Sequence, residues 1–177
     1  MKKKSLNKRI DHSFFCRDVL KVAPDLVGKI LVRRYSDGSE KRWLITETEA
    51  YRGEEDLACH ASKGRTPRTE VMYHPGGKVY VYLIYGMYWM LNFVTGNEDD
   101  PQAVLIRAVE GHTGPGRVTK NIRIDKSFYG EDLSASDRIW VEDNGLKAKY
   151  RTDVRVGIDY AGPVWKNKKW RFILEQK

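Results

Sequence analysis

The sequence is poor in cysteine and has no long hydrophobic segment. Its 177 residues include only Cys16 and Cys59, too few for a disulfide framework, and neither has histidine partners at zinc-ligand spacing. No run approaches the roughly 18 uncharged apolar residues of a membrane span. The basic start MKKKSLNKRI leads into further charged residues without the apolar core of a secretion signal. We therefore expect reduced thiols, no bound metal, no membrane association and a cytoplasmic protein.

Three motifs of nucleotide and hydrolase chemistry are also absent. The sequence contains no GxxxxGKS/T phosphate loop, no GxGxxG after a strand and no GxSxG elbow. Nucleotide hydrolysis, dinucleotide chemistry and α/β-hydrolase chemistry therefore have no support from motifs.

The chain does have an excess of positive charge. It carries 32 Lys and Arg against 24 Asp and Glu, a formal charge of +8. The excess gathers at residues 2–9, 117–126 and 166–171. Such clusters suit a polyanion, because neutralisation of phosphates gives affinity that is independent of sequence. Charge alone does not separate a nucleic-acid surface from ordinary solvated faces, so both interpretations stay open.

Composition and length predict one continuous domain behind a short arm. With 41% hydrophobic residues the chain can bury a core, and no linker or repeat divides it. Residues 1–10 are expected to form a flexible basic arm and residues 11–177 the domain. The chain gives no sign of a dimer, so we expect a monomer.

The patterning of apolar residues predicts an α+β fold. Strands are expected at residues 29–35, 42–51, 78–84, 87–95, 103–110, 138–142 and 170–174. Helices are expected at residues 17–27, broken near Pro24, at residues 66–73 behind a Thr66–Pro67 cap, and at residues 114–124. We therefore expect a mostly antiparallel, curved sheet with peripheral helices and a protruding hairpin at residues 78–95.

Two carboxylates and a phenol alternate along the strand ITETEAY. The period of two places Glu47, Glu49 and Tyr51 on one face. Arg107 lies in the apolar run AVLIRAV, where a guanidinium needs an acidic partner or a ligand, and Glu49 is the candidate. A carboxylate held by an arginine stays ionised at neutral pH, as a base that orients water must be. A buried ion pair that only fixes the fold is the alternative.

The segment KVYVYLIY places aromatic side chains on one face of a strand. Tyr80, Tyr82 and Ile84 alternate with Val79, Val81 and Leu83, so one face is aromatic and the other aliphatic. An aromatic face beside basic clusters can stack bases, although tyrosines also fill half-buried sheets. Tyr85 stands beside Gly86 at the hairpin tip, where its ring has little core to enter and can wedge into a duplex.

Two further polar residues have both a functional and a structural interpretation. Asn92 is a polar group in the apolar run MLNFV, and His60 follows an acidic loop. Either can bind a ligand, but a buried amide can also serve the fold, and a lone loop histidine is often only exposed. Cys59 and His60 lack partners at metal-ligand spacing, so no metal site is predicted there.

Several motifs together resemble a known family. The segments ETEAY, CHASKGRTPR, HPGGKVYVYLIYGM, LNF and AVLIRAVE occur in that order and resemble the alkyladenine (3-methyladenine) DNA glycosylase family. The resemblance starts near FFCRDVLKVAPDLVGK and continues through GPGRVTKNIRIDKSF and RVGIDYAG. Thr69 stands where Asn is common in the family, and Met90 where Cys is frequent. These departures leave the catalytic positions untouched.

The resemblance implies excision of damaged purines from duplex DNA, with no cofactor and no covalent enzyme intermediate. It assigns Glu49 as the base that activates the water attacking the deoxyribose C1′, and Arg107 as the residue that helps to place this water. The product would be the free base and an abasic site, without strand cleavage.

The resemblance also implies roles in binding the flipped base. Tyr51, His60 and Tyr82 would surround the base, and Asn92 would disfavour the exocyclic amino group of guanine.

On the DNA side, the resemblance implies that Tyr85 fills the gap in the base stack and that Met87 presses on the neighbouring bases. Thr66 and Arg68 would contact the DNA as well. The sequence does not rank the lesions that the pocket would accept.

Two other functions fit parts of the pattern. A non-catalytic module for single-stranded DNA or RNA would use the same aromatic face and would ignore lesions. Hydrolysis of a nucleoside or glycoside by the Glu47 and Glu49 pair is the third hypothesis.

Overall fold

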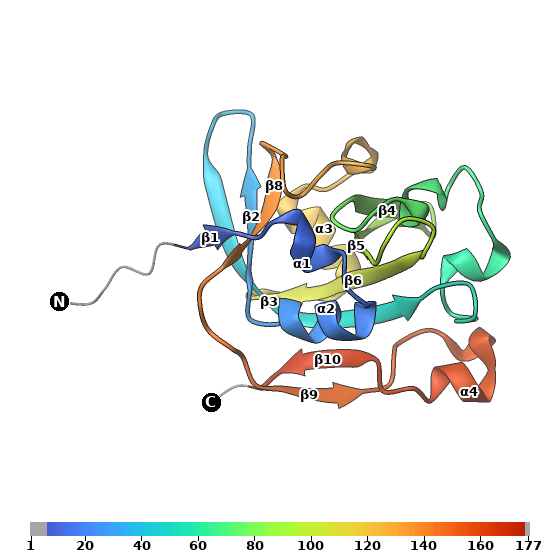
Figure 1. The fold of residues 1–177 in the computed structure, drawn as a ribbon. Coiled ribbons are helices and arrows are strands. Elements are labelled where there is room, and N and C mark those ends of the chain that lie inside the picture. Colours follow the sequence, from blue (N-terminus) through green and yellow to red (C-terminus); the bar gives the residue numbers. More distant parts are fainter. Residues whose placement is uncertain (1–6, 176–177) are drawn as a thin grey trace.

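The structure is a computed structural model that describes residues 7–175, and its centre is a curved sheet (Figure 1). The strands are β1 (Lys8–Arg9), β2 (Ile30–Arg34), β3 (Glu40–Arg52), β4 (Val79–Ile84), β5 (Tyr88–Thr95), β6 (Gln102–Val109), β7 (His112–Thr113), β8 (Ile139–Asp143), β9 (Tyr150–Asp153) and β10 (Arg171–Leu174). They follow the order β1-β8-β2-β3-β6-β5-β4, with β7 on β6 and with β10 between β3 and β9. All these pairings are antiparallel, which confirms the α+β class.

The long strand β3 connects the two parts of the sheet. Residues 40–44 pair with β2, and residues 45–52 pair with β6, with register shifts on both sides of Glu47. The other edge of β3 pairs with β10, where Glu49 faces Arg171 and Glu47 faces Ile173. Both carboxylates therefore lie on an interior strand, where side chains are held by neighbours on either side.

Short helices cover the sheet. They are α1 (His12–Phe15), α2 (Val19–Leu26), α3 (Pro115–Ile122) and α4 (Gly162–Lys166), with 3₁₀ helices η1 (His60–Lys63), η2 (Glu70–Tyr73), η3 (Lys126–Phe128) and η4 (Asp159–Ala161). The carboxylates of Asp11 and Asp18 accept backbone N–H bonds and so cap α1 and α2. Helix α2 packs on β3 and β6, and α3 packs on β5 and β6. Their apolar side chains join the main core.

The expected break of the first long helix at Pro24 is wrong. Helix α2 runs through Pro24 to Leu26, and Ala23 and Pro24 are both buried. The hydroxyl of Thr48 on β3 donates a 2.8 Å hydrogen bond to the carbonyl of Ala23. Tertiary packing and this bond outweigh the local preference of the residue before proline.

The expected helix at residues 66–73 is also shorter than predicted. Thr66 opens a turn, because its carbonyl and hydroxyl accept the N–H of Thr69 at 3.1 and 3.3 Å. Helical structure begins only at Glu70, as the 3₁₀ helix η2. Thr69 is buried and its hydroxyl also bonds the carbonyl of Gly64, which holds this segment as a loop.

The predicted hairpins and the later helix are confirmed, and a few elements were missed. β2–β3 and β4–β5 pair as hairpins, and α3 follows Gly114, whose φ is +98°. The first six residues of the predicted arm lie outside the described part of the chain, whereas Lys8 and Arg9 pair with β8. Strand β9 was missed because its side chains are mostly exposed and show no apolar alternation.

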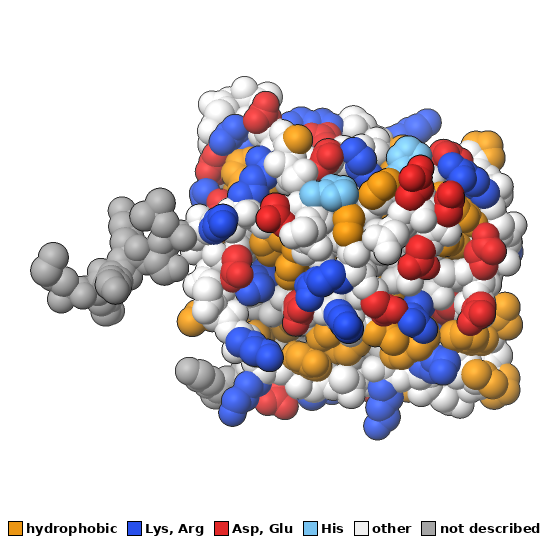
Figure 2. All heavy atoms as spheres, in the orientation of Figure 1, with side chains coloured by type: hydrophobic (Ala, Val, Ile, Leu, Met, Phe, Trp, Pro, Cys, Tyr) orange, Lys and Arg blue, Asp and Glu red, His pale blue; other side chains and the backbone are white. Residues whose placement is uncertain are grey.

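The face in view in Figure 2 mixes acidic and basic side chains and is crossed by an apolar band. Surface arginines on several elements are already paired, for example Arg17 with Asp25 and Arg52 with Asp18. Total charge therefore overstates the basic surface that is free for a partner. Among residues 7–175, no helix has the length and apolar character needed to cross a membrane.

Candidate active site

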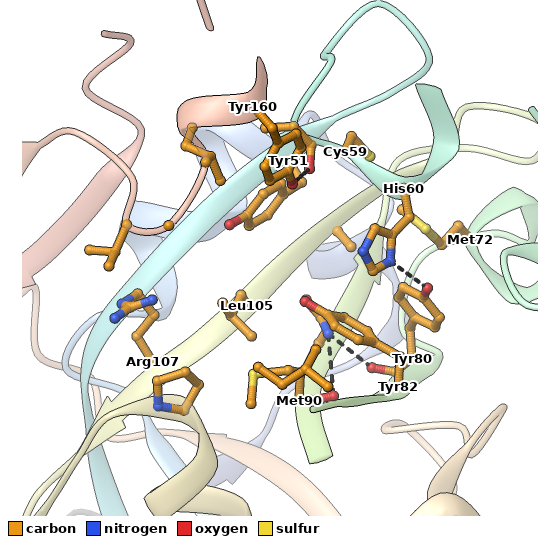
Figure 3. Close-up of a pocket in the computed structure, with 18 of the residues that line it drawn as sticks. Tyr51, Cys59, His60, Met72, Tyr80, Tyr82, Met90, Leu105, Arg107 and Tyr160 are labelled. Atoms are coloured by element: carbon orange, nitrogen blue, oxygen red, sulfur yellow. Dashed lines mark hydrogen bonds between the residues drawn. The ribbon is translucent and has the colours of Figure 1, made fainter. Parts of the chain in front are cut away.

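A cavity of about 320 Å³ opens beside the tip of the β4–β5 hairpin. Its walls come from β3, β4, β5 and β6, from the start of η1 and the two residues before it, from η2 and the start of α3, and from residues 156–160 (Figure 3). The expected aromatic face is there, because Tyr80, Tyr82 and Ile84 all line the cavity. On the opposite face Val79 and Val81 are buried as expected, but Leu83 is 41% exposed and lies outside the core.

Glu49 lies immediately behind the cavity wall. Its side chain is 0% exposed, and each carboxylate oxygen accepts one short hydrogen bond. The Tyr51 hydroxyl donates to Oε2 at 2.7 Å, and the Val156 backbone N–H donates to Oε1 at 2.7 Å. Arg107 approaches the same Oε1 to 3.6 Å. Tyr51, Val156 and Arg107 themselves line the cavity. The residues that contact the Glu49 carboxylate therefore separate it from the cavity.

Burial dominates the electrostatics of Glu49. Desolvation raises the pKa of its carboxyl group above the usual value, and the attraction of Arg107 and the two hydrogen bonds only partly oppose this. Arg107 acts in the expected direction, because its charge lowers the pKa of Glu49, but desolvation by burial is the larger effect. Burial and the neighbouring charge of Glu49 also raise the pKa of Tyr51. This phenol therefore stays protonated and donates a hydrogen bond to the carboxylate.

The second carboxylate of the strand shares the predicted face but not the same partners. Oε1 of Glu47 accepts Nε of Arg107 at 3.1 Å and Nη1 of Arg171 at 3.0 Å. Two guanidinium groups thus hold Glu47. Arg107 donates its hydrogen bond to Glu47 and meets the expected partner, Glu49, as an ion pair at 3.6 Å. This environment leaves Glu47 poorly placed to act as the acid of a two-carboxylate glycosidase.

Tyr51, His60 and Tyr82 line the cavity with their rings. The rings of His60 and Tyr82 meet edge to face, with centroids 4.4 Å apart. Nδ1 of His60 shares a 2.8 Å hydrogen bond with the Tyr80 hydroxyl. Burial, and then the charges of Arg68 and Lys63, lower the pKa of His60 to about 4. The imidazole is therefore neutral at physiological pH. His60 lines the cavity and is not the merely exposed loop histidine that was the alternative interpretation.

Asn92 is buried on β5 and also lines the cavity. Its side-chain nitrogen donates to the carbonyls of Tyr80 at 3.2 Å and Met90 at 3.4 Å. Both amide hydrogens are thus used within the protein. The side chain is a fixed part of the wall, and the group left for a ligand is its oxygen.

The residues expected to contact DNA lie around the mouth of the cavity. Tyr85 is 86% exposed and Met87 64% exposed at the β4–β5 tip. Tyr85 and Gly86 both have positive φ, and Met87 N–H bonds the carbonyl of Ile84, which are the features of a type I′ turn. Thr66 and Arg68 line a second, adjoining hollow, and the Arg68 guanidinium lies 5.1 Å from the Tyr82 ring centroid.

Sequence reasoning missed five residues of the site, one of which acts through its backbone. Arg155 and Asp56 form an ion pair at 2.6 Å in which both side chains are 0% exposed, and this pair holds the segment that carries Val156. Tyr160 lines the cavity mouth and Arg171 binds Glu47. Arg155 stands between two valines in the polar stretch TDVRVGID, so the apolar run that singled out Arg107 is missing there. A backbone donor such as Val156 leaves no mark in a sequence.

The described residues contain no cluster of three or more histidine, cysteine or acidic side chains able to hold a metal ion. Cys16 and Cys59 are both free thiols. Burial raises the pKa of Cys59 to about 12, which makes it an inert part of the wall rather than a nucleophile.

A comparison with protein families shows the family of the chain. A family model described as methylpurine-DNA glycosylase matches residues 13–113 and 110–177. The chain belongs to the methylpurine-DNA glycosylase family. The first matched range includes Glu49, Arg107 and the aromatic walls, and the second includes Val156 and Arg171, so the match spans the whole cavity.

Similar proteins occur in several bacteria. A protein from Psychrobacter cryohalolentis is 45% identical over 89% of this chain and 87% of its own length. One from Rickettsia felis is 43% identical over 96% of both chains, and one from Natranaerobius thermophilus is 42% identical over 94% and 95%. All three carry the provisional name of a 3-methyladenine DNA glycosylase. The resemblance seen in the sequence is confirmed, and it supports a DNA glycosylase role.

Proposed function

We propose that this protein flips damaged purines out of duplex DNA and hydrolyses their N-glycosidic bond with a water activated by Glu49. The single observation that carries the proposal is the position of this carboxylate. It is held by the Tyr51 hydroxyl, the Val156 N–H and Arg107, directly behind an aromatic-walled cavity. The proposed products are the free base and an abasic site.

The cavity supports recognition of electron-poor bases. Tyr51, Tyr82 and the neutral His60 offer aromatic faces and edges, and an alkylated purine carries positive charge that such rings attract. The same positive charge lets the base leave as a neutral molecule. Asn92 is a fixed group in the wall, held by two hydrogen bonds, and can exclude by shape a base that carries an extra amino group.

The hairpin tip supports base flipping. A water reaches C1′ in line only when the nucleotide has left the stack, and unstacking costs a few kcal/mol, least for damaged or mispaired bases. Tyr85 presents an exposed ring beside the cavity mouth, where it can replace the missing base. Met87 follows at the same tip and would press on the adjacent bases.

In the chemical step Glu49 accepts a proton from the attacking water. Its raised pKa makes it a stronger base than an exposed glutamate, provided that it is ionised at the working pH. Arg107 lines the cavity beside Glu49 and can orient the water. The residues lining the cavity include no lysine, and lysine is the residue that forms Schiff bases with an opened sugar. This supports a monofunctional enzyme without strand cleavage.

A panel of lesions tests the proposal. Duplexes that contain 3-methyladenine, 7-methylguanine, hypoxanthine or ethenoadenine are incubated with wild-type protein and with Glu49→Gln, and the free base and strand breaks are measured. We expect base release by the wild type, a loss of roughly 10²–10⁴-fold in Glu49→Gln, retained DNA binding and no breaks before alkali. No release from any lesion, or equal affinity for damaged and undamaged strands, would favour the non-catalytic module.

A further inference from the structure

A chain of alternating charges runs from the cavity to the β9–β10 hairpin. Glu49 faces Arg107 at 3.6 Å, Arg107 donates to Glu47 at 3.1 Å, Glu47 accepts from Arg171 at 3.0 Å, and Arg171 donates to Asp153 at 2.9 Å. The first three residues lie on β3 and β6, and the last two come from the C-terminal hairpin.

Arg171 is locked by partners on every side. Its Nε donates to the carbonyl of Val154 at 2.7 Å, Nη1 to Glu47 and Nη2 to Asp153. Its side chain is only 18% exposed. Because every nitrogen of the guanidinium has an acceptor within the protein, Arg171 is unsuited to bind a DNA phosphate. The β10–β3 pairing, which sets Arg171 opposite Glu49, fixes its height along the strand.

Arg171 also gives Glu47 a second cationic partner, so that Glu47 and Glu49 do not both depend on Arg107 alone. Without it, Glu47 and Glu49 would both depend on Arg107. With it, Glu47 has a second guanidinium and binds Arg107 only through Nε. Among the described residues, the Nη atoms of Arg107 have no hydrogen-bond partner and approach only Glu49, so they remain available for the cavity.

We propose that Arg171 is a positioning residue for the glycosylase reaction: it holds Glu47, which in turn orients Arg107 toward Glu49 and the attacking water. The inference rests on the proposed function of Glu49. It adds to that function a role for the C-terminal hairpin, which touches the reaction only through Glu47.

The test compares Arg171→Gln with Arg151→Gln. Arg151 lies on the same hairpin, is 58% exposed and approaches Asp153 only to 3.7 Å, so its loss removes the same charge without touching Glu47. We expect the single-turnover rate of base release to fall roughly ten- to a hundredfold in Arg171→Gln and to stay at the wild-type value in Arg151→Gln. Affinity for undamaged DNA should be equal in the two variants.

The pH profile separates positioning from a loosened hairpin. The charged and titratable groups that interact with Glu49 are the guanidinium groups of Arg107 on β6 and Arg155 after β9 and the phenols of Tyr51, Tyr82 and Tyr160. None of these groups is changed in the variants. Arg171→Gln removes a nearby positive charge and should move the acid limb of the rate profile to higher pH. Glu47→Gln removes a negative charge and should move it to lower pH, while also slowing the reaction. If Arg171 and Glu47 only hold the fold together, the acid limb should stay at the wild-type pH in both variants.

A readout without catalysis tests the orientation of Arg107 separately from the proposed function. The Nε–H of Arg107 should exchange with solvent faster in Arg171→Gln than in Arg151→Gln, as followed by ¹⁵N NMR. If Arg171→Gln fails to fold, Arg171→Lys serves, since an ammonium cannot satisfy all three acceptors. Equal exchange, rate and pH limb in the Arg171 and Arg151 variants would overturn the inference. Absence of base release by the wild type would instead contradict the proposed function.

Discussion

Two arginine–carboxylate pairs flank the same end of β3, and they are built differently. Asp56 accepts four hydrogen bonds, from both terminal nitrogens of Arg155 at 2.6 and 2.9 Å and from the backbone N–H groups of Arg52 and Ala58 at 3.0 and 3.1 Å. Glu49 accepts one bond per oxygen and meets Arg107 only at 3.6 Å. The Asp56 carboxylate is saturated, whereas Glu49 keeps acceptor capacity.

The difference separates a structural pair from a reactive one. A saturated buried pair fixes the backbone segments that it joins, here the loop after β3 and the segment that carries Val156. A buried carboxylate with spare capacity is costly for the fold, and it is useful only where a water or substrate completes it.

Breaking the saturated pair should have the largest effect on stability. Arg155→Met leaves Asp56 buried without its cation and should lower the free energy of unfolding by about 3–5 kcal/mol. Arg107→Met should cost less, because Glu49 can take up a proton, yet it should impair base release. Urea denaturation of both variants measures the difference. Equal losses of stability would mean that the two pairs are of one kind.

Neutralising the reactive carboxylate should stabilise the protein. The pKa of Glu49 is raised in the folded state, so the ionised form costs stability above that pKa and costs nothing below the ordinary pKa of glutamate. Glu49→Gln should therefore raise Tm at neutral pH, and its advantage over the wild type should vanish as the pH falls toward the ordinary glutamate value. Thermal unfolding across this pH range is the measurement; a variant less stable than wild type at pH 7 would contradict it.

At the β4–β5 tip, too, a residue proposed to act on DNA lowers the stability of the fold. Tyr85 has φ = +51°, a conformation that is strained for a residue with a side chain. Tyr85→Gly should raise the free energy of unfolding by up to about 1 kcal/mol, while Tyr85→Ala keeps the strain and gains nothing. Both should lose lesion excision because both lack the ring. If affinities for damaged and undamaged duplexes fall equally, the ring is not a wedge.

The sequence predicts much of this contrast because strand periodicity is strict. The alternation in ITETEAY placed Glu47, Glu49 and Tyr51 together, and the apolar run around Arg107 required an acidic partner, so the cluster followed from local pattern. Which carboxylate receives the hydrogen bond from Arg107 did not follow, since it depends on Arg171 arriving from a strand more than a hundred residues later.

Other features were beyond local reasoning for related causes. Helix α2 passes Pro24 because the sheet supplies packing and a hydroxyl donor, and the raised pKa of Glu49 comes from burial by segments distant in sequence. The Val156 N–H is a backbone group that any residue but proline would offer. The sequence thus predicts the strands and the side chains that they present, while desolvation and long-range partners require the assembled fold.

The smallest expected effect concerns the basic surface beside the cavity. Helix α3 begins at Pro115, which lines the cavity, and the exposed Lys120 on this helix makes no salt bridge to a described carboxylate, whereas Arg34 is bound by Glu40. Lys120→Gln should reduce the slope of log K against log salt by about one if Lys120 contacts a phosphate. Arg34→Gln should leave the slope unchanged, because Glu40 already neutralises Arg34. Titration of duplex DNA at several salt concentrations decides this, and equal slopes for Lys120→Gln and wild type would place α3 away from the DNA.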